Sequence, residues 1–298
     1  MKWSITKEHD SMLVRDFLHQ VCGLSRRIIK VLKFQGGSIL VDGAHKDVRH
    51  KLQEGETIQI IFPPEARGPA MVAERLPIEI VYEDEDVLVI NKPAGIATIP
   101  SVNHTSGTIA NRLLGYYDEQ NLQYTVHIVT RLDRDTSGLL LVAKHRLSHS
   151  ILSRDQKLGA VNRSYYAIVE GQLQERQSTI DLPIGRKEDS IIQRAVLPDG
   201  QQAITHYEVE QEMADETLVS VRLQTGRTHQ IRVHFSHLGH PLLGDDLYGG
   251  DLTKMKRQAL HCKSLAFNQP FSGERITLGC DMPGDMASLL KEKVFDHK

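Results

Sequence analysis

The amino-acid sequence predicts an α+β fold, in which a mixed, mostly antiparallel sheet with flanking helices follows a small α/β module. Strand-like segments outnumber helix-like segments after residue 77, and the two kinds do not alternate as in a doubly wound parallel sheet. Before residue 63, two helical patterns precede two strand patterns. The stretch 63–77 has four prolines and no hydrophobic period, which is typical of a linker. We expect a module at 1–62, a linker at 63–77 and a larger domain at 78–298.

The module begins with two predicted helices. Apolar residues recur at helical spacing from Leu13 to Val21, Gly23 can end this helix, and Ser25 can cap the next. The second helix separates apolar from basic side chains: Ile28, Ile29 and Leu32 lie largely opposite Arg26, Arg27, Lys30 and Lys33. A pair of glycines at 36–37 ends it, and strands are expected at 38–43 and 56–62.

The charge distribution sets the module apart. Residues 1–62 contain ten Lys and Arg against seven Asp and Glu, a net charge of +3, so the remainder carries −5 of the total of −2. A solvated face is the usual meaning of a charged helix. Here, however, the basic residues of the second helix have no acid among them, and Arg15 lies on the helix before. This grouping favours a phosphate-binding surface.

The larger domain starts with two predicted strands in 78–93, joined by an acidic turn at 83–86. Further strands are expected at 138–144, 164–171, 203–210, 217–224, 261–267 and 275–279. Helices are expected around 108–117, 147–158, 228–237 and 286–294.

Several features limit the class of protein. The three cysteines are far apart in sequence and odd in number, which argues against a disulfide framework. The first ten residues lack the apolar core of a signal peptide, and no apolar run approaches the roughly 20 residues of a membrane span. We expect a soluble, cytoplasmic protein that has no membrane partner. No exposed apolar stripe indicates a dimer contact, so a monomer is expected.

The segment 131–144, RLDRDTSGLLLVAK, contains Asp133 and Asp135 alternating with Arg131 and Arg134. A charged surface turn is the simplest interpretation, because Asp, Thr, Ser and Gly form turns. A turn beside an apolar strand can also lift one carboxylate into a cleft, where a neighbouring arginine favours its ionised form. Such a carboxylate can act as a nucleophile or a base.

A second segment, 222–250, contains Gly226 at an expected strand-to-helix turn. The backbone N–H groups of Arg227 and Thr228 would there form an anion site at the start of a helix. Four histidines follow, but their spacing does not match a zinc motif, and no metal is expected. Asp245 and Asp246 are interpreted as turn residues because two glycines lie just beyond them.

Tyr165 and Tyr166 lie on an expected strand, so they face opposite sides of the sheet. Only one of them can face a given cleft, and core packing is the alternative for both. A tyrosine in a cleft could stack on a base or handle a proton.

Together these segments resemble a known family. RLDRDTSGLLLVAK is similar to the signature of the pseudouridine synthases that modify ribosomal and transfer RNA and share an Arg-Leu-Asp-x-x-Thr-Ser-Gly motif. Other blocks follow in the family's order, namely VLVINKPAGIATIPS, YYAIVEG, LQTGRTHQIRVHF, HPLLGDDLYG and RQALHCKSLAF. The resemblance implies the pseudouridine synthase fold, with a central cleft. Residues 13–62, which include GLSRR, resemble the RNA-binding module first known from ribosomal small-subunit protein four.

The resemblance assigns roles residue by residue. It implies that Asp133 is the catalytic residue, that Tyr165 is the active-site tyrosine, and that Arg227, in Thr-Gly-Arg, pairs with the catalytic acid. RNA contacts are expected from Arg15, Arg26, Arg27, Lys30, Lys33, Arg131 and Arg134. The chain departs from many members of the family by having Thr130 before Arg-Leu-Asp and Arg163 in place of a lysine.

The implied reaction moves uracil from one bond at the sugar to another, so no cofactor is expected. Asp133 would attack the sugar, as in retaining glycoside hydrolysis, or deprotonate the adjacent sugar carbon. Ribosomal RNA is the expected substrate, with transfer RNA as the alternative. Two other classes of protein make different demands on the sequence. An inactive RNA-binding relative would lack Asp133, Tyr165 or Arg227, and a glycosidase or metal hydrolase would need two separated carboxylates or a ligand set. The sequence supports neither.

Overall fold

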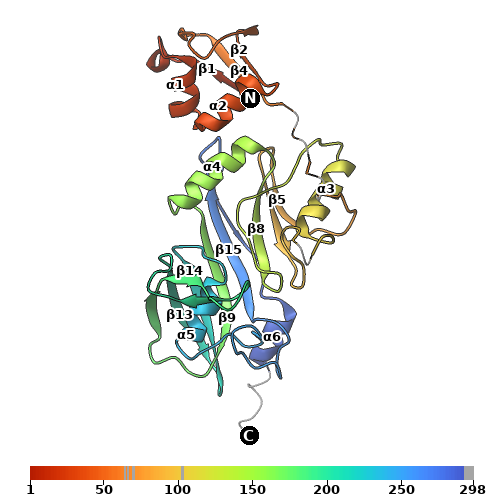
Figure 1. Cartoon of the computed structure of the whole chain (residues 1–298), viewed down its shortest axis with the longest axis vertical. Helices are drawn as coiled ribbons and strands as arrows, with labels where there is room; N and C mark the ends of the chain where they lie inside the picture. The colour runs from red at the N-terminus through yellow and green to blue at the C-terminus, as the bar shows by residue number, and fades with distance from the viewer. Residues whose placement is uncertain (64, 66, 69–70, 102–103, 292–298) are drawn as a thin grey trace.

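The computed structural model describes residues 1–63, 65, 67–68, 71–101 and 104–291. The smaller of its two main sheets lies at one end of the molecule (Figure 1) and has the antiparallel order β1-β4-β2-β3. Its strands are β1 Lys2–Ser4, β2 Ser38–Val41, β3 Ala44–His45 and β4 Thr57–Ile61. The predicted strands are β2 and β4. The sequence did not indicate β1 and β3, which are only three and two residues long.

Helix α2, Arg26–Phe34, has the expected cap and the expected faces. The Ser25 hydroxyl accepts a hydrogen bond from the N–H of Ile28 at 3.3 Å, which pairs one of the unpaired donors at a helix start. Ile28, Val31 and Leu32 are buried, whereas Arg26, Arg27, Lys30 and Lys33 are exposed.

The helical segment before α2 is confirmed, but it is irregular. A short α1, Val14–Asp16, continues into a π-helical turn, Phe17–Val21. The N–H of Cys22 reaches the carbonyl of Phe17 at 3.0 Å. The turn is therefore wider than the α-helix that the apolar spacing predicted.

The larger sheet confirms the predicted α+β class. Its strand order is β10-β13-β14-β9-β15-β8-β6-β5, with β16 paired to β15 and β7 paired to β8. The strands are β5 Ile80–Glu83, β6 Val87–Lys92, β7 His127–Ile128, β8 Ser137–Ala143, β9 Asn162–Glu170, β10 Gln177–Asp181, β13 Ile204–Glu212, β14 Glu216–Leu223, β15 Leu260–Asn268 and β16 Arg275–Gly279. A separate ribbon contains β11 Ile184–Arg186 and β12 Arg194–Val196.

Four longer helices accompany this sheet: α3 Ile109–Glu119, α4 Arg146–Lys157, α5 Gln230–His237 and α6 Gly284–Lys291. All four were predicted, although the expected end of the last one, at 294, lies outside the described residues. Thr108 begins α3 with a capping box, in which its side chain accepts from the Asn111 N–H and its N–H donates to the Asn111 side chain.

A parallel pairing between β8 and β15 joins the two halves of the larger sheet. All other strand pairs in the described part of this sheet are antiparallel. At the joint, Gly138 has a φ of +108°. A Cβ atom there would lie 2.3 Å from the carbonyl oxygen of Cys262. Only glycine permits this approach, and it places the start of β8 beside Cys262 of β15, which is paired in turn with Tyr165 of β9.

Helix α4 packs against the N-terminal module (Figure 1). Leu147 and Ile151 on one side of α4 are 0% and 5% exposed, and they belong to the same apolar cluster as Leu18, Leu24 and Ile28 of the module. This apolar contact fixes the position of the module relative to the larger sheet.

The segment expected as a linker packs on α3 where it is described. The Asn111 side chain donates to the carbonyl of Val72 at 2.7 Å, and the N–H of Glu74 donates to the carbonyl of Asn111 at 2.9 Å. A Cβ at Gly115 would lie 2.2 Å from the Glu74 carbonyl oxygen. This segment is therefore a packed strap on α3.

A buried histidine at the joint predicts acid sensitivity. His261 faces the Ser137 hydroxyl at 2.9 Å, and burial, with the charge of Arg257, lowers its pKa to about 4. Between pH 6.5 and pH 4 the unfolded chain therefore binds one more proton at this residue. His261 should therefore leave the free energy of unfolding unchanged above pH 6.5. Between pH 6.5 and pH 4 it should lower this free energy by about 1.4 kcal/mol per pH unit.

The measurement is urea unfolding at several pH values for wild type and His261→Gln. Half-buried His149 and His229 and buried His234 also have lowered pKa values, so the variant should lose only part of the acid dependence. The exposed His237 supplies the control, His237→Gln. If His261→Gln and wild type lose stability in parallel below pH 6.5, His261 does not contribute.

Candidate active site

A pocket of about 700 Å³ lies beside the joint of the larger sheet. Its walls come from residues 97–99, 128–136, strand β9 and the segment 223–232. Among the described residues, its lining includes one carboxylate, Asp133, and six arginines: Arg131, Arg134, Arg163, Arg194, Arg227 and Arg232. Such a pocket favours a polyanionic ligand.

Asp133 lies on a loop that is held from several sides. The carbonyl of Asp133 accepts the Thr136 N–H at 3.1 Å, and the carbonyl of Leu132 accepts the Thr98 hydroxyl at 2.8 Å. Buried Lys92 donates from Nζ to the carbonyl of Arg134 at 2.8 Å. These bonds fix the backbone on both sides of Asp133, so its carboxylate is presented to the pocket in one position.

The Lys92 side chain connects this loop to the loop after β6 by hydrogen bonds. Its Nζ also donates to the carbonyls of Pro93 and Ile96, at 2.9 and 2.8 Å. Burial lowers the pKa of Lys92 to about 7, while Asp135 and Asp133 oppose the shift. Three carbonyl acceptors need three N–H donors, so the geometry requires the ammonium form.

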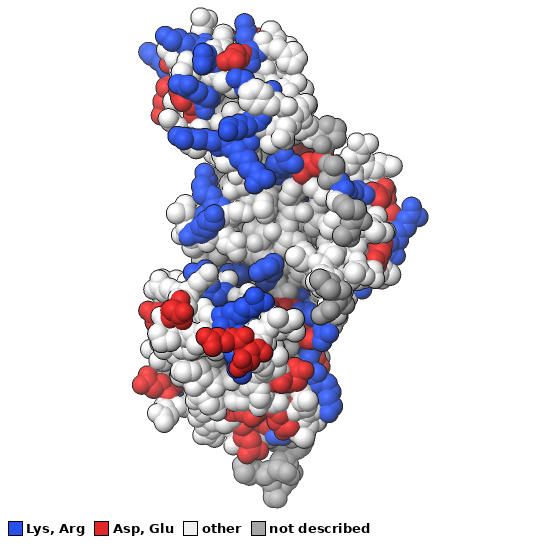
Figure 2. Space-filling model, viewed as in Figure 1, with Lys and Arg blue, Asp and Glu red and all other residues white. Residues whose placement is uncertain are grey.

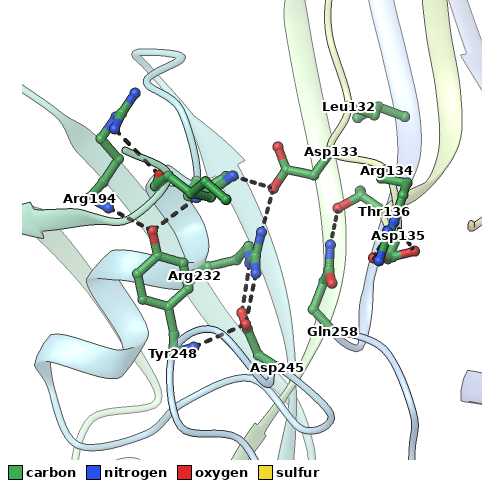
Figure 3. Close-up of polar contacts among 12 residues, drawn as sticks. Leu132, Asp133, Arg134, Asp135, Thr136, Arg194, Arg232, Asp245, Tyr248 and Gln258 are labelled. Atoms are coloured by element: carbon green, nitrogen blue, oxygen red, sulfur yellow. Dashed lines mark hydrogen bonds and ion pairs between the residues drawn. The ribbon is translucent and has the colours of Figure 1, made fainter. Parts of the chain in front are cut away.

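The ion-pair partner of Asp133 is Arg232 of α5, which corrects the predicted pairing with Arg227 (Figure 3). Arg232 Nη1 lies 3.1 Å from Asp133 Oδ2. Arg227 also lines the pocket, but it is exposed and its Nε donates to the carbonyl of Gln202 at 2.9 Å. Arg227 sits on the turn before α5, whereas Arg232 projects from within the helix.

Asp245 fixes the orientation of Arg232. It is fully buried and accepts two hydrogen bonds from Arg232, from Nε at 2.7 Å and from Nη2 at 2.8 Å. Burial opposes the charge of Arg232, but the hydrogen bond to Asp245 and the charge of Asp133 outweigh it and raise the pKa of Arg232. The interpretation of Asp245 as a turn residue was therefore incomplete, because its side chain also binds Arg232 and so orients the partner of Asp133.

His229 and Tyr248 complete the wall around this ion pair. The Tyr248 hydroxyl accepts the Arg194 N–H at 2.9 Å and lies 2.9 Å from His229 Nδ1. The Tyr248 hydroxyl can donate to Nδ1 of neutral His229; in that tautomer the ring hydrogen lies on Nε2, which is 3.9 Å from Asp133 Oδ2. Burial lowers the pKa of His229, which favours this neutral form.

Tyr165 lines the pocket from β9, whereas Tyr166 packs in a different apolar cluster, so the expected alternation is found. Tyr165 is 3% exposed. Burial raises the pKa of its hydroxyl, so the phenol form dominates at neutral pH. Its position in the wall suits packing against a bound ring better than service as a free phenolate base.

The residues next to Asp133 in the sequence differ in their exposure and in their contacts. Arg131 is exposed at the pocket. Arg134 forms an ion pair with Asp135 at 2.8 Å. Thr130 is 1% exposed, and its hydroxyl accepts the N–H of Leu141 at 3.0 Å, so it ties the loop to β8.

The basic residues predicted on the module lie away from this pocket. None of them is among its lining residues, and all are exposed. Arg15 and Lys33 lie near Asp16 and Asp47, at 3.5 and 3.6 Å. No ion pair links Arg26, Arg27 or Lys30 to a described carboxylate.

The described residues at the start of α5 do not form the anion site that the sequence predicted there. The helix begins at Gln230, and the side chain of Gln230 accepts the N–H of Arg227 at 2.9 Å. His234 binds Thr205 and the carbonyl of Leu182 in the interior. No group of three or more His, Cys, Asp or Glu among the described residues could hold a metal ion. No described helix is long and apolar enough to cross a membrane.

The sequence prediction missed Arg232, Asp245, His229 and Tyr248 as site residues. A signal for Arg232 is its place between Ile231 and Val233, because a permanent charge on a short, largely buried helix requires a partner. Its partners lie 99 residues before it and 13 residues after it, so sequence proximity could not identify both.

The fold places one oriented carboxylate, Asp133, in a pocket rich in arginine, an arrangement that suits a polyanionic substrate. A family model described as "RNA pseudouridylate synthase" matches residues 86–237. The "uncharacterized RNA pseudouridine synthase YjbO" of Bacillus subtilis is 48% identical over 280 residues, which cover 94% of this chain and 99% of YjbO. The chain therefore belongs to the RNA pseudouridine synthase family.

Other relatives agree with this assignment. The "ribosomal large subunit pseudouridine synthase D" of Pseudomonas aeruginosa is 39% identical over 268 residues, covering 85% of this chain and 83% of the relative. The solved structure of "human RNA pseudouridylate synthase domain containing 1" matches with a TM-score of 0.57 and 25% identity, covering 73% of this chain and 86% of that one.

Proposed function

We propose that this enzyme converts uridine to pseudouridine in ribosomal RNA of the large subunit, with Asp133 as the catalytic carboxylate. The observation that carries this proposal is the Asp133–Arg232 ion pair in a pocket lined by five further arginines. The names of several relatives, among them synthase D from Pseudomonas aeruginosa, refer to the ribosomal large subunit, which favours ribosomal RNA over transfer RNA.

The reaction exchanges one bond for another. The bond from N1 of uracil to the sugar carbon C1′ breaks, and a bond from C5 of uracil to C1′ forms. Asp133 attacks C1′ or takes the proton from the neighbouring sugar carbon, and both routes use the same carboxylate. In the last step C5 loses its proton, and N1, which is no longer bonded to the sugar, takes up a proton, so that the product is an isomer of the substrate. The target base must leave its stack to enter the pocket, where Tyr165 packs against the detached ring.

The test is complementation of a strain that lacks this gene. Wild-type protein should restore pseudouridine at one or more uridines of large-subunit ribosomal RNA, mapped by a chemical label specific for pseudouridine. Restoration only in transfer RNA would contradict the proposed substrate. If no RNA regains pseudouridine, the proposed activity is wrong.

We further propose that residues 1–62 form an RNA-binding module of the type found in ribosomal small-subunit protein four. Its support is helix α2, whose exposed Arg26, Arg27 and Lys30 form no ion pair with a described carboxylate. Unpaired cations on one helix face can contact phosphates without reading sequence. Arg131 and Arg134 would contact RNA at the pocket itself.

Arg26→Glu with Arg27→Glu is expected to weaken RNA binding and to reduce the slope of log affinity against log salt by about one for each phosphate that α2 no longer binds. Filter binding across a salt series measures both quantities. Lys7→Glu with Lys46→Glu makes the same charge change on exposed residues outside α2 and serves as the control. Equal slopes for the two double variants would remove α2 from the RNA-binding surface.

A further inference from the structure

A second groove, of about 610 Å³, adjoins the active-site pocket. The two share a wall formed by Gln156, Arg163, Leu223, Gly226 and Arg227. Among the described residues, the second groove is lined by four cations and by no carboxylate; the cations are Lys157, Arg163, Arg222 and Arg227. A groove lined in this way attracts anions.

Arg163 in the shared wall is an unusual buried cation. The residue is only 8% exposed, and no described group accepts a hydrogen bond from its Nε. No described carboxylate forms an ion pair with it. A buried charge without a partner is costly, and an anion in the groove would supply an acceptor for Arg163. The planar guanidinium matches the oxygens of a phosphate.

The outer part of the groove leads along α4 toward the module. Lys157 ends α4, and Arg154, one turn earlier, lies beside Gly23 of the module, since a Cβ on Gly23 would be 2.9 Å from Arg154 Nη1. Lys157 and Arg222 are both exposed and form no ion pair with a described acid. Figure 2 shows Lys and Arg gathered on the module and on the surface between it and the centre of the molecule, whereas Asp and Glu gather over the opposite half.

We propose that this groove binds the sugar–phosphate backbone of the RNA strand that flanks the target uridine. Arg163 and Arg227 hold a phosphate where the pocket and the groove meet, and Arg222 and Lys157 hold phosphates farther along. The strand then continues over α4 toward helix α2. This inference rests on the proposed function, and it assigns to the groove the backbone contacts that position the substrate.

The test measures RNA binding by protein that cannot turn over. In an Asp133→Ala background, Lys157→Ala with Arg222→Ala is compared with Arg176→Ala with Lys256→Ala, which removes two exposed cations outside the groove. The probes are a transcribed fragment of large-subunit ribosomal RNA that spans the mapped uridine and a short single-stranded oligouridylate. Removing two cations that bind single-strand phosphates should reduce the salt slope by about 1.4, equivalent to a roughly tenfold higher Kd at 0.15 M salt.

A groove variant that binds both RNAs like the control variant would overturn the proposal. Arg163→Lys tests the shared wall, because lysine keeps the charge but loses the planar fork. Its Kd should rise several-fold while its circular dichroism matches wild type, and wild-type affinity would exclude the Arg163 contact. Failure of wild type to form pseudouridine would instead overturn the proposed function, and the oligouridylate measurement would still decide whether the groove binds RNA.

Discussion

Replacing Asp133 with asparagine should reduce pseudouridine formation by more than about a thousand-fold, because the amide keeps the shape of the side chain but lacks the charge that attacks or deprotonates the sugar. The fold should survive. Asp133 is partly exposed, and Arg232 keeps both hydrogen bonds to Asp245 when Asp133 changes. We expect a decrease of about 1 kcal/mol or less in unfolding free energy.

Single-turnover measurement on unmodified large-subunit ribosomal RNA checks this result, with circular dichroism melting as the test of folding. Asp135→Asn is the matched control, because Asp135 lies two residues away and its carboxylate faces Arg134 at the surface. It should stay within a few-fold of wild type. Substantial activity of Asp133→Asn, or equal losses in both variants, would show that the catalytic carboxylate has been assigned wrongly.

The sequence predicted the main elements of the fold because their signals are local. The segments that form β6, β8 and β13 were all predicted as strands, and Ser25 was predicted as the cap of α2. The elements that it missed are short or largely exposed. Strand β1 has three residues, and β11 and β12 form a separate two-stranded ribbon with three residues in each strand. Such segments gain strand structure from their partners more than from their own pattern.

The site shows a different limit. Asp133 and Tyr165 were predicted from family motifs, and both line the pocket. The partner of Asp133 was predicted wrongly, because Arg227 and Arg232 occur in the same motif. Only the direction in which each side chain leaves the backbone shows which of the two contacts Asp133. Arg232 points inward from α5 between Asp133 and Asp245, whereas Arg227 precedes the helix. A sequence motif records which residue types are present. It does not show where the helix begins, and the position of a residue relative to that start decides whether its side chain faces the pocket.

Replacing Asp245 with alanine should lower the free energy of unfolding by about 3 to 5 kcal/mol, more than Asp133→Asn does. The reason is that it leaves the buried Arg232 charge without its bidentate partner. Activity should also fall steeply, since Arg232 is then free to turn away from Asp133. Urea unfolding followed by circular dichroism measures the unfolding of the sheet. Fluorescence of Trp3, the single tryptophan, follows the N-terminal module separately.

The double variant Arg232→Met with Asp245→Leu distinguishes the effect of leaving Arg232 without its bidentate partner from the effect of the missing side-chain volume. It removes both charges and fills the site with apolar side chains, so it should be more stable than Asp245→Ala and close to wild type. It should nevertheless be inactive, because Asp133 then lacks the guanidinium that lies 3.1 Å away. If the double variant is no more stable than Asp245→Ala, the cost comes from packing around Asp245 and not from the loss of the bidentate partner of Arg232. If it is stable and active, Arg232 is not needed to orient Asp133, and the ion pair serves the fold alone.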